Sequence, residues 1–362
     1  MKKSLLAVAV LGAFAGAASA QSSVTLSGTV DVNLRYVKND DTKFKQLGTD
    51  GINSSQLVFS GREDLGSGSW AGFTLNSGIN PDTGTSNSKF WNRRSTVSLG
   101  GNFGEIRLGR DYNPTFWNMT VFDPFGTNGV GDMTHAFTNP SVGGLTAAQS
   151  ALLPAGGEAG TANTTTVRSD NAVQYYLPSN LGGVYGNVMI AAGEGLTNTR
   201  YEGGRIGYAA GPINVGIAYG QTHLLVKDNK LKHFDFGASY DFGFAKLVGQ
   251  YIRLKTNEIG GVSGVDGTQD IWQIGTVIPL GQGEIHASYN RNKGKDDLED
   301  VGSKMAAIGY VYNLSKRTAL YGTYSYLKND TNGFYAVGGS VPAGQTLGFK
   351  SQGAEFGLRH FF

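Results

Sequence analysis

Apolar and polar residues alternate along most of this chain. In VTLSGTVDVNLRYV at 24–37 the even positions, such as Val32 and Leu34, are mainly apolar, whereas odd positions such as Asp31 and Asn33 are polar. A repeat of two residues places one kind of side chain on each face of a β-strand. We count sixteen such segments, the last being AEFGLRHFF at 354–362. The pattern therefore predicts an all-β protein with sixteen strands.

The connections between these segments alternate between short and long. Short turns rich in Gly, Asp, Asn and Pro lie near 63–69, 100–104, 178–183, 210–213, 241–244, 279–283 and 314–318. Long loops lie near 38–51, 80–92, 112–166, 194–200, 221–231, 255–269, 291–303 and 328–350. Seven turns and eight loops that join sixteen strands predict an antiparallel meander.

Such a meander fits either a secreted sandwich or a closed barrel. Charged residues such as Arg94, Arg168 and Arg359 fall on the polar face, while the apolar face carries charge only near strand ends, as at Arg253. In a transmembrane barrel the apolar face meets lipid and the polar face lines the lumen. We therefore expect a 16-stranded antiparallel transmembrane β-barrel, closed because an open edge would leave backbone groups unpaired in hydrocarbon.

Composition and charge exclude several other classes of protein. Glycine accounts for 55 of 362 residues, about twice the usual share of about 7%, yet without the strict three-residue repeat of collagen. The chain has no cysteine, which excludes thiol catalysis and disulfide frameworks. The formal net charge of +2 is too small to suggest a nucleic-acid partner.

The first twenty residues read as an export signal. Lys2 and Lys3 precede an apolar run, and Ala18-Ser19-Ala20 fits the small-residue rule before a cut at Gln21. The run is too short for a membrane anchor. We expect residues 1–20 to be cleaved and residues 21–362 to form the barrel, formally neutral after the loss of two lysines.

Six segments in order carry a resemblance to a known family. They are TLSGTVDVNLRY at 25–36, GREDLGSG at 61–68, GRDYNP at 109–114, RSDNAVQYYLPSNLGG at 168–183, YNLSKRTALYGTYSYL at 312–327 and GLRHFF at 357–362. The mature chain resembles the general-diffusion porins of Gram-negative outer membranes, of the beta-proteobacterial type. The resemblance implies a homotrimer in the cell outer membrane, in contact with the lipid bilayer and lipopolysaccharide. It also implies a water-filled pore for passive diffusion of small polar solutes and inorganic ions.

The resemblance also implies where the pore narrows. Loop 112–166 is far longer than the others, and long loops of this kind are usually functional. In the family the third long loop folds into the lumen, and we carry over Asp123 and Asp132 as its acidic residues. The aromatic C-terminus, Phe362, matches the signal that the barrel-assembly machinery reads during biogenesis.

Opposite the loop, the family places basic side chains on the barrel wall. Parity along the strands points Arg35, Arg94 and Arg168 inward, so we expect them to face the loop acids. The family commonly has a basic residue where this chain has Gln56, which predicts only a modest anion preference.

Several alternatives remain open. A substrate-specific channel with a saturable binding track is the main one, because Trp91, Trp117 and Phe116 could line an entrance. An adhesin or receptor that uses loops 255–269 and 328–350 is another. No enzyme motif is present, and we expect no catalytic residue, cofactor or metal.

Two local charge patterns receive simpler interpretations. His286 and Glu284 share one lumen-facing strand, where a wall hydrogen bond is expected rather than a catalytic pair. KGKDDLED at 293–300 suggests a divalent-ion site or a lipopolysaccharide contact. Acidic outer loops are usually only solvated and the spacing does not match an EF-hand, so we assign no metal there.

Overall fold

The computed structural model describes residues 23–138, 167–194, 200–223, 230–257, 266–338, 341 and 345–362. The predicted export signal at 1–20 and residues 139–166 of loop 112–166 lie outside the described residues. Within the described residues, no helix is long and apolar enough to cross a membrane.

One antiparallel sheet curves round on itself and closes. Its strands are β1 (Ser23–Asn39), β2 (Thr42–Thr49), β3 (Gln56–Gly66), β4 (Ser69–Asn80), β6 (Arg94–Gly101), β7 (Gly104–Tyr112), β8 (Arg168–Tyr176), β9 (Val184–Ala191), β10 (Tyr201–Ala210), β11 (Ile213–His223), β12 (Lys230–Asp241), β13 (Lys246–Thr256), β14 (Gly267–Leu280), β15 (Gly283–Asp296), β16 (Ser303–Asn313), β17 (Thr318–Asn329) and β18 (Lys350–Phe361). The remaining strand, β5 (Thr85–Ser86), pairs only with β4.

Sixteen strands make the barrel wall, as predicted. β2 and β3 pair with the two halves of β1, so together they form a single, interrupted barrel strand. β1 pairs on its other side with β18 from Thr29↔Phe361 to Asn39↔Ser351, which closes the barrel. The prediction of a 16-stranded antiparallel barrel is confirmed.

The prediction of a long loop at 38–51 is wrong. β1 continues to Asn39, a tight turn at Asp40 and Asp41 follows, and β2 begins at Thr42. Asp40 adopts a positive φ of 43°, which a short aspartate side chain tolerates. The polar run at 38–46 suggested a loop, because strand ends beyond the apolar band of a barrel are polar on both faces.

The two faces of the wall differ as a barrel in lipid requires. Outward side chains are apolar and exposed, for example Leu34 at 64%, Ile190 at 62% and Phe356 at 58%. Inward side chains such as Asp31 and Asn290 are polar and fully buried. This inverts the arrangement of a soluble protein, and lipid is the solvent that stabilises such an outer surface.

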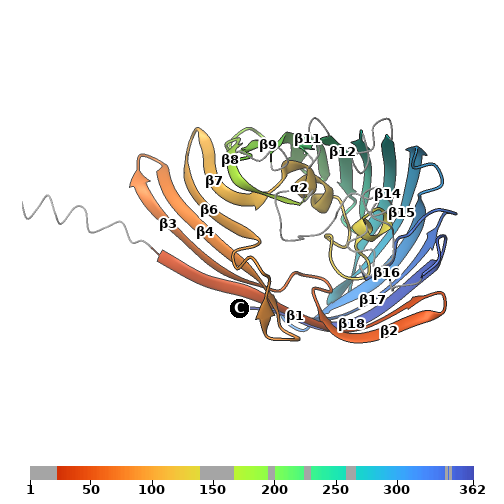
Figure 1. Ribbon diagram of the computed structural model, residues 1–362. Coiled ribbons are helices and arrows are strands. Elements are labelled where there is room, and N and C mark those ends of the chain that lie inside the picture. The colour runs from red at the N-terminus through yellow and green to blue at the C-terminus, as the bar shows by residue number, and fades with distance from the viewer. Residues whose placement is uncertain are drawn as a thin grey trace, which may run out of the picture.

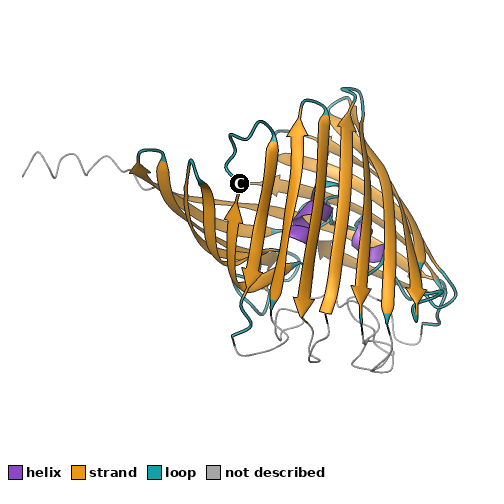
Figure 2. Ribbon diagram, turned by 90° about the horizontal axis from the view of Figure 1, so that it is seen from above, coloured by secondary structure: helices purple, strands orange, loops and turns teal. Residues whose placement is uncertain are grey.

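In the described residues, two short helices lie within the curved wall. They are α2 (Pro114–Val121) and the 3₁₀ helix η2 (Met133–Ala136), both in loop 112–166. Figure 1 shows α2 on the concave side of the sheet, and Figure 2 shows both helices enclosed by the strands.

Candidate pore constriction

The described part of loop 112–166 is built to pack on the inner wall. Asn113 has an extended backbone and Pro114 follows at the first helical position, so α2 begins directly after β7. The helix contacts β9, β10, β11 and β12. It ends at Phe122, whose ring lies against Gly237 of β12, where a Cβ would overlap the ring. A glycine there lets the loop approach the wall closely.

The tip of the loop is a tight turn held by Asp123. Its carboxylate accepts hydrogen bonds from the backbone N–H of Thr127 at 2.8 Å and of Phe125 at 3.3 Å. It also accepts one at 3.0 Å from the side-chain amide of Gln273, an inward-facing residue of β14. Burial, with a further contribution from the charge of Asp132, raises the pKa of Asp123 to about 7. Asp123 therefore both shapes the loop and attaches it to the wall.

A basic cluster gathers on the wall around Tyr112, at the end of β7. The hydroxyl of Tyr112 accepts hydrogen bonds from Arg168 at 2.6 Å and from Arg93 at 2.8 Å. The Arg168 guanidinium also lies 4.2 Å from the centre of the Tyr112 ring. Gln56 accepts a hydrogen bond from Arg93 at 3.0 Å. We call Gln56, Arg93, Tyr112 and Arg168 the wall cluster.

Sequence reasoning did not single out Arg93. It lies just before β6, so strand parity gave no signal for its orientation. The amide of Gln56, where the family commonly has a basic residue, instead orients the guanidinium of Arg93.

The wall cluster and the loop face each other across one cavity of about 390 Å³. All four residues of the cluster line the cavity from the wall, and Asp132 lines it from the loop. Asp132 also begins η2, where its carboxylate accepts a hydrogen bond from the N–H of Thr134 at 2.7 Å. A guanidinium group and a carboxylate on opposite sides create a transverse field across this cavity. Arg168 and Asp132 are the two expected site residues that the structure brings together.

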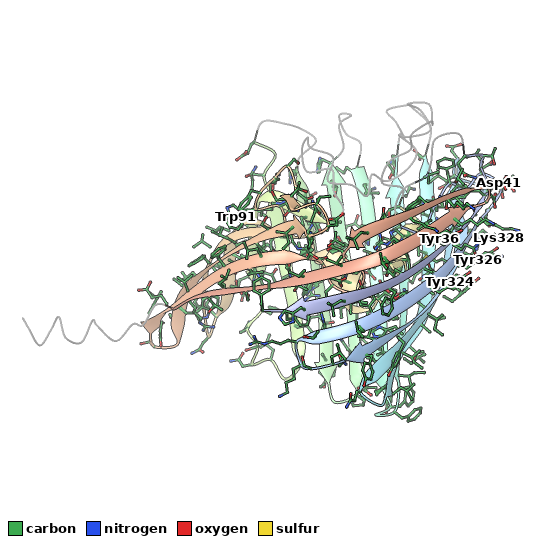
Figure 3. The ribbon with its side chains drawn as sticks, turned by 90° about the horizontal axis from the view of Figure 1, so that it is seen from below. Tyr36, Asp41, Trp91, Tyr324, Tyr326 and Lys328 are labelled. Carbon is green, nitrogen blue, oxygen red and sulfur yellow. The ribbon has the colours of Figure 1, made fainter. Side chains whose placement is uncertain are left out.

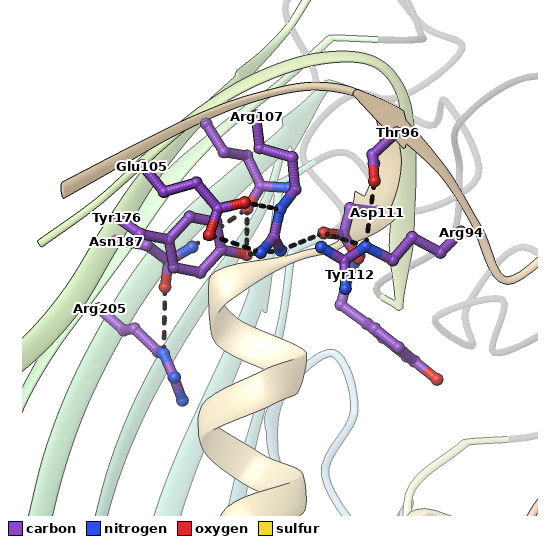
Figure 4. A network of polar contacts seen from close by, with 10 residues as sticks. Arg94, Thr96, Glu105, Arg107, Asp111, Tyr112, Tyr176, Asn187 and Arg205 are labelled. Atoms are coloured by element: carbon purple, nitrogen blue, oxygen red, sulfur yellow. Dashed lines mark hydrogen bonds and ion pairs between the residues drawn. The ribbon is translucent and has the colours of Figure 1, made fainter. Parts of the chain in front are cut away.

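Arg94 belongs to a different network, shown in Figure 4. Its guanidinium lies 3.4 Å from Asp111, and Arg107 binds the same carboxylate at 2.6 Å. Arg107 also binds Glu105 at 2.8 Å. Two guanidinium groups and two carboxylates offset each other here, so this part of the wall contributes little net charge.

Arg35 is held by an acid from the far end of the chain. Its guanidinium lies 2.9 Å from Glu355 of β18. The other oxygen of Glu355 accepts a hydrogen bond from the N–H of Val130 at 3.1 Å. Glu355 thus connects β18, where the barrel closes on β1, to loop 112–166. Its carboxylate also offsets the charge of Arg35.

The interruption between β2 and β3 forms a second inward projection, which sequence reasoning missed. The carboxylate of Asp31 accepts hydrogen bonds from the N–H groups of Ile52 and Asn53, both at 2.9 Å. The backbone oxygen of Asp50 accepts one from Gly129, and Asn53 lines the cavity of the wall cluster. A break inside a barrel strand is hard to predict from the sequence. The only sign of this one is the run DGINSS at 50–55, in which apolar and polar residues do not alternate.

The loop after β17 also packs inward in its described part. Tyr335 and Val337 are fully buried, and both belong to an apolar cluster that includes Phe125 from the loop tip. The Tyr335 hydroxyl accepts a hydrogen bond from Gln269 of β14 at 2.7 Å. The apolar run FYAV at 334–337 was the signal that could have found this contact.

His286 and Phe362, two other residues named from the sequence, have defined partners in the structure. His286 forms the expected wall hydrogen bond with Glu284 at 3.0 Å, and its other ring nitrogen lies 2.5 Å from the backbone oxygen of Pro124. Phe362 ends the chain at the barrel seam, where its backbone exchanges two hydrogen bonds of 3.1 Å with Gly28. Among the described residues, no group of three potential metal ligands occurs.

Known proteins share this barrel architecture. A family model described as Gram-negative porin matches residues 7–332. The chain belongs to the Gram-negative porin family. This porin is 39% identical over 383 residues to outer membrane porin protein 32 of Delftia acidovorans, and the match covers 100% of both chains. It is 30% identical to an outer membrane porin protein of Bordetella pertussis, covering 91% of this chain and 95% of the relative.

Solved structures agree with the sequence comparison. The anion-selective porin from Comamonas acidovorans superposes with a TM-score of 0.80 at 34% identity, over 94% of this chain and 100% of the other. OmpF of Salmonella typhi shares the fold at 15% identity, with a TM-score of 0.66 over 94% and 97% of the two chains. This porin therefore forms a pore in the Gram-negative outer membrane for passive diffusion of small hydrophilic solutes and ions.

Proposed function

We propose that the pore favours anions and that the cavity between the wall cluster and Asp132 is its selectivity filter. The observation that carries this proposal is the convergence of Arg93 and Arg168 on one hydroxyl group, that of Tyr112. Two cations held side by side along the route of a hydrated ion attract anions and repel cations. The networks of Arg94 and Arg35 contain their own carboxylates. The wall cluster differs from these networks because it places two guanidinium groups on one cavity.

Support also comes from the solved relative described as an anion-selective porin, which covers 94% of this chain. The expected preference is modest, because Gln56 is neutral and Asp132 contributes a negative charge to the same cavity. The reversal potential in a salt gradient across a planar bilayer tests the proposal. An anion-selective reading supports it, and a cation-selective reading refutes it.

We further propose the assembly and the biogenesis that the family implies. The chain is exported by residues 1–20, is inserted by the barrel-assembly machinery through Phe362, and forms a homotrimer in contact with lipopolysaccharide. One solved porin of the same fold, OmpT of Vibrio cholerae, is described as a trimer form. Conductance steps in groups of three are expected from such a trimer, whereas single steps of uniform size would contradict it.

A substrate-specific channel is the second candidate, and one observation favours it. Tyr112 stacks on Phe116 with ring centres 5.5 Å apart, and Trp117 lines the same cavity. Aromatic faces beside guanidinium groups could hold a planar anionic solute. Liposome swelling with solutes of graded size separates the two candidates. A general pore sorts solutes by size alone, whereas a specific channel saturates with one of them. Neither candidate requires catalysis, and we propose no enzymatic activity.

A further inference from the structure

A second cavity, of about 320 Å³, lies between the tip of loop 112–166 and the barrel wall. Residues 123–126 line it from the loop, and inward-facing residues of β15, β16, β17 and β18 line it from the wall. Asn53 and Gly126 line both this cavity and that of the wall cluster, so the two cavities adjoin. Among the described residues, no member of the wall cluster lines the second cavity, which is therefore a separate site.

The second cavity lies toward the barrel end with the short turns. Figure 3 shows Tyr324 farther than Lys328 from the barrel end that carries Asp41. Thr323, the next residue of β17, lines the cavity. Glu284, which also lines it, is the second residue of β15 and follows a short turn directly. The short turns of such barrels face the periplasm. A solute therefore meets this cavity between the loop tip and the periplasmic mouth of the pore.

Arg359 brings an available cationic group to the second cavity. The residue is only 9% exposed, and its guanidinium carbon lies 3.9 Å from the centre of the Phe361 ring. Its Nη1 donates a hydrogen bond to the side chain of Asn53 at 3.1 Å. Among the described residues, its buried Nε has no hydrogen-bond partner and no carboxylate forms an ion pair with it. A guanidinium group has five N–H donors, so Arg359 can still bind a carboxylate from outside the chain.

Glu284 supplies the opposite charge in a fixed orientation. One oxygen of its carboxylate lies 3.0 Å from a ring nitrogen of His286, and the other ring nitrogen lies 2.5 Å from the backbone oxygen of Pro124. The Glu284 side chain is 42% exposed, and its Oε2 forms no hydrogen bond with another described residue. Asp123 also lines the cavity, but its carboxylate already accepts three hydrogen bonds. Glu284 is therefore the carboxylate that can bind a cationic group.

Arg359 and Glu284 attract each other across the cavity without meeting. Their strands are three spacings apart in the sheet, which is about 14 Å along the wall. The two charges still interact, yet no ion pair joins them in the part of the chain that the structure describes. A molecule that carries a carboxylate and an ammonium group close together can bridge such a gap. Ile52, Phe125 and Val311 add apolar surface beside it.

We propose that the second cavity binds a small zwitterionic solute, an α-amino acid with a short aliphatic side chain. The carboxylate of the solute binds Arg359, its ammonium group binds Glu284, and its side chain lies against the apolar lining. A zwitterion has no net charge, so an anion filter does not select it, and this cavity adds a preference that the filter lacks. The site does not depend on the proposed filter, because the two use different residues.

The ion current through single channels in a planar bilayer tests the proposal, because a solute held in the lumen reduces that current. The probes are L-alanine, propionate and ethylamine, added to both sides of the membrane. Propionate lacks the ammonium group of L-alanine, and ethylamine lacks its carboxylate. We expect L-alanine to reduce the current in a saturable manner, and neither of the other two to do so at the same concentrations.

The test variants E284Q and R359Q each remove one of the two charges. The matched controls E105Q and R205Q remove the same kinds of charge from the part of the wall shown in Figure 4, outside the second cavity. We expect the half-saturating concentration of L-alanine to rise about tenfold in each test variant and to stay unchanged in the controls. R359K, which keeps the charge, should show a smaller rise.

Three outcomes overturn the proposal: an equal effect of the three probes, an unchanged half-saturating concentration in both test variants, or the same rise in the controls. If R359Q forms no channel, E284Q decides the outcome, because Glu284 lies outside the closing strand β18. The reversal potential in a salt gradient is measured on the same channels. A cation-selective reading together with saturation by L-alanine refutes the anion filter and supports the zwitterion site.

Discussion

The charge of Arg168 should decide much of the ion preference of the pore. The change Arg168→Gln removes one positive charge from the cavity that Asp132 lines, while keeping a polar side chain next to the Tyr112 hydroxyl. An ion that passes at about 4 Å from a unit charge gains or loses about 1 kcal/mol in water, and about 4 kcal/mol at a lower effective dielectric constant. The lumen is aqueous, so we use the smaller value. It corresponds to a change of about fivefold in the occupancy of an anion.

The assay is the reversal potential across a planar bilayer with a tenfold gradient of potassium chloride. We expect the anion permeability to fall about fivefold and the cation permeability to rise about fivefold in R168Q, so their ratio falls by up to about 25-fold. The ratio should stay near its original value in R168K, which keeps the charge. R94Q is the second comparison, because Arg94 lies beside Asp111 at 3.4 Å and does not line the cavity. A shift in R94Q equal to or larger than that in R168Q would refute the assignment of the filter.

Three further predictions concern loop 112–166 and its contacts with the wall. Gly237→Val should displace the Phe122 ring from the wall and raise single-channel conductance, whereas Gly249→Val, where the nearest atom to an added Cβ is 3.8 Å away, should leave conductance unchanged. Burial raises the pKa of Asp123 to about 7 and that of Asp132 to about 6, so both carboxyls lose their charge between pH 8.5 and pH 5.5, Asp123 first. The anion preference should therefore increase as the pH falls through 7, and an unaltered pH profile in D123N would contradict this origin. Glu355→Gln should remove the charge that neutralises Arg35 and weaken the hydrogen bond to Val130. The anion preference and the current noise should therefore both rise in bilayer recordings. E355D, which keeps the carboxylate, should show a smaller rise in both.

The sequence contained enough information to place single residues on the two faces of the wall. Alternation is a property of each strand alone, so Leu34 and Phe356 could be assigned outward and Asp31 inward before any strand partner was known. The long gap at 112–166 likewise indicated a functional loop. The turn at Asp40 was missed, because the ends of barrel strands extend beyond the lipid and lose their alternation.

The chain sequence by itself determined a closed barrel with a polar lumen, because hydrocarbon permits no unpaired strand edge. Only the tertiary structure decided which charges meet. Arg35 and Glu355 lie at opposite ends of the chain and come together through the closure of β1 on β18. Arg93, and not the predicted Arg94, lines the cavity. The orientation of Arg93 depends on Gln56, a residue of another strand, through their hydrogen bond.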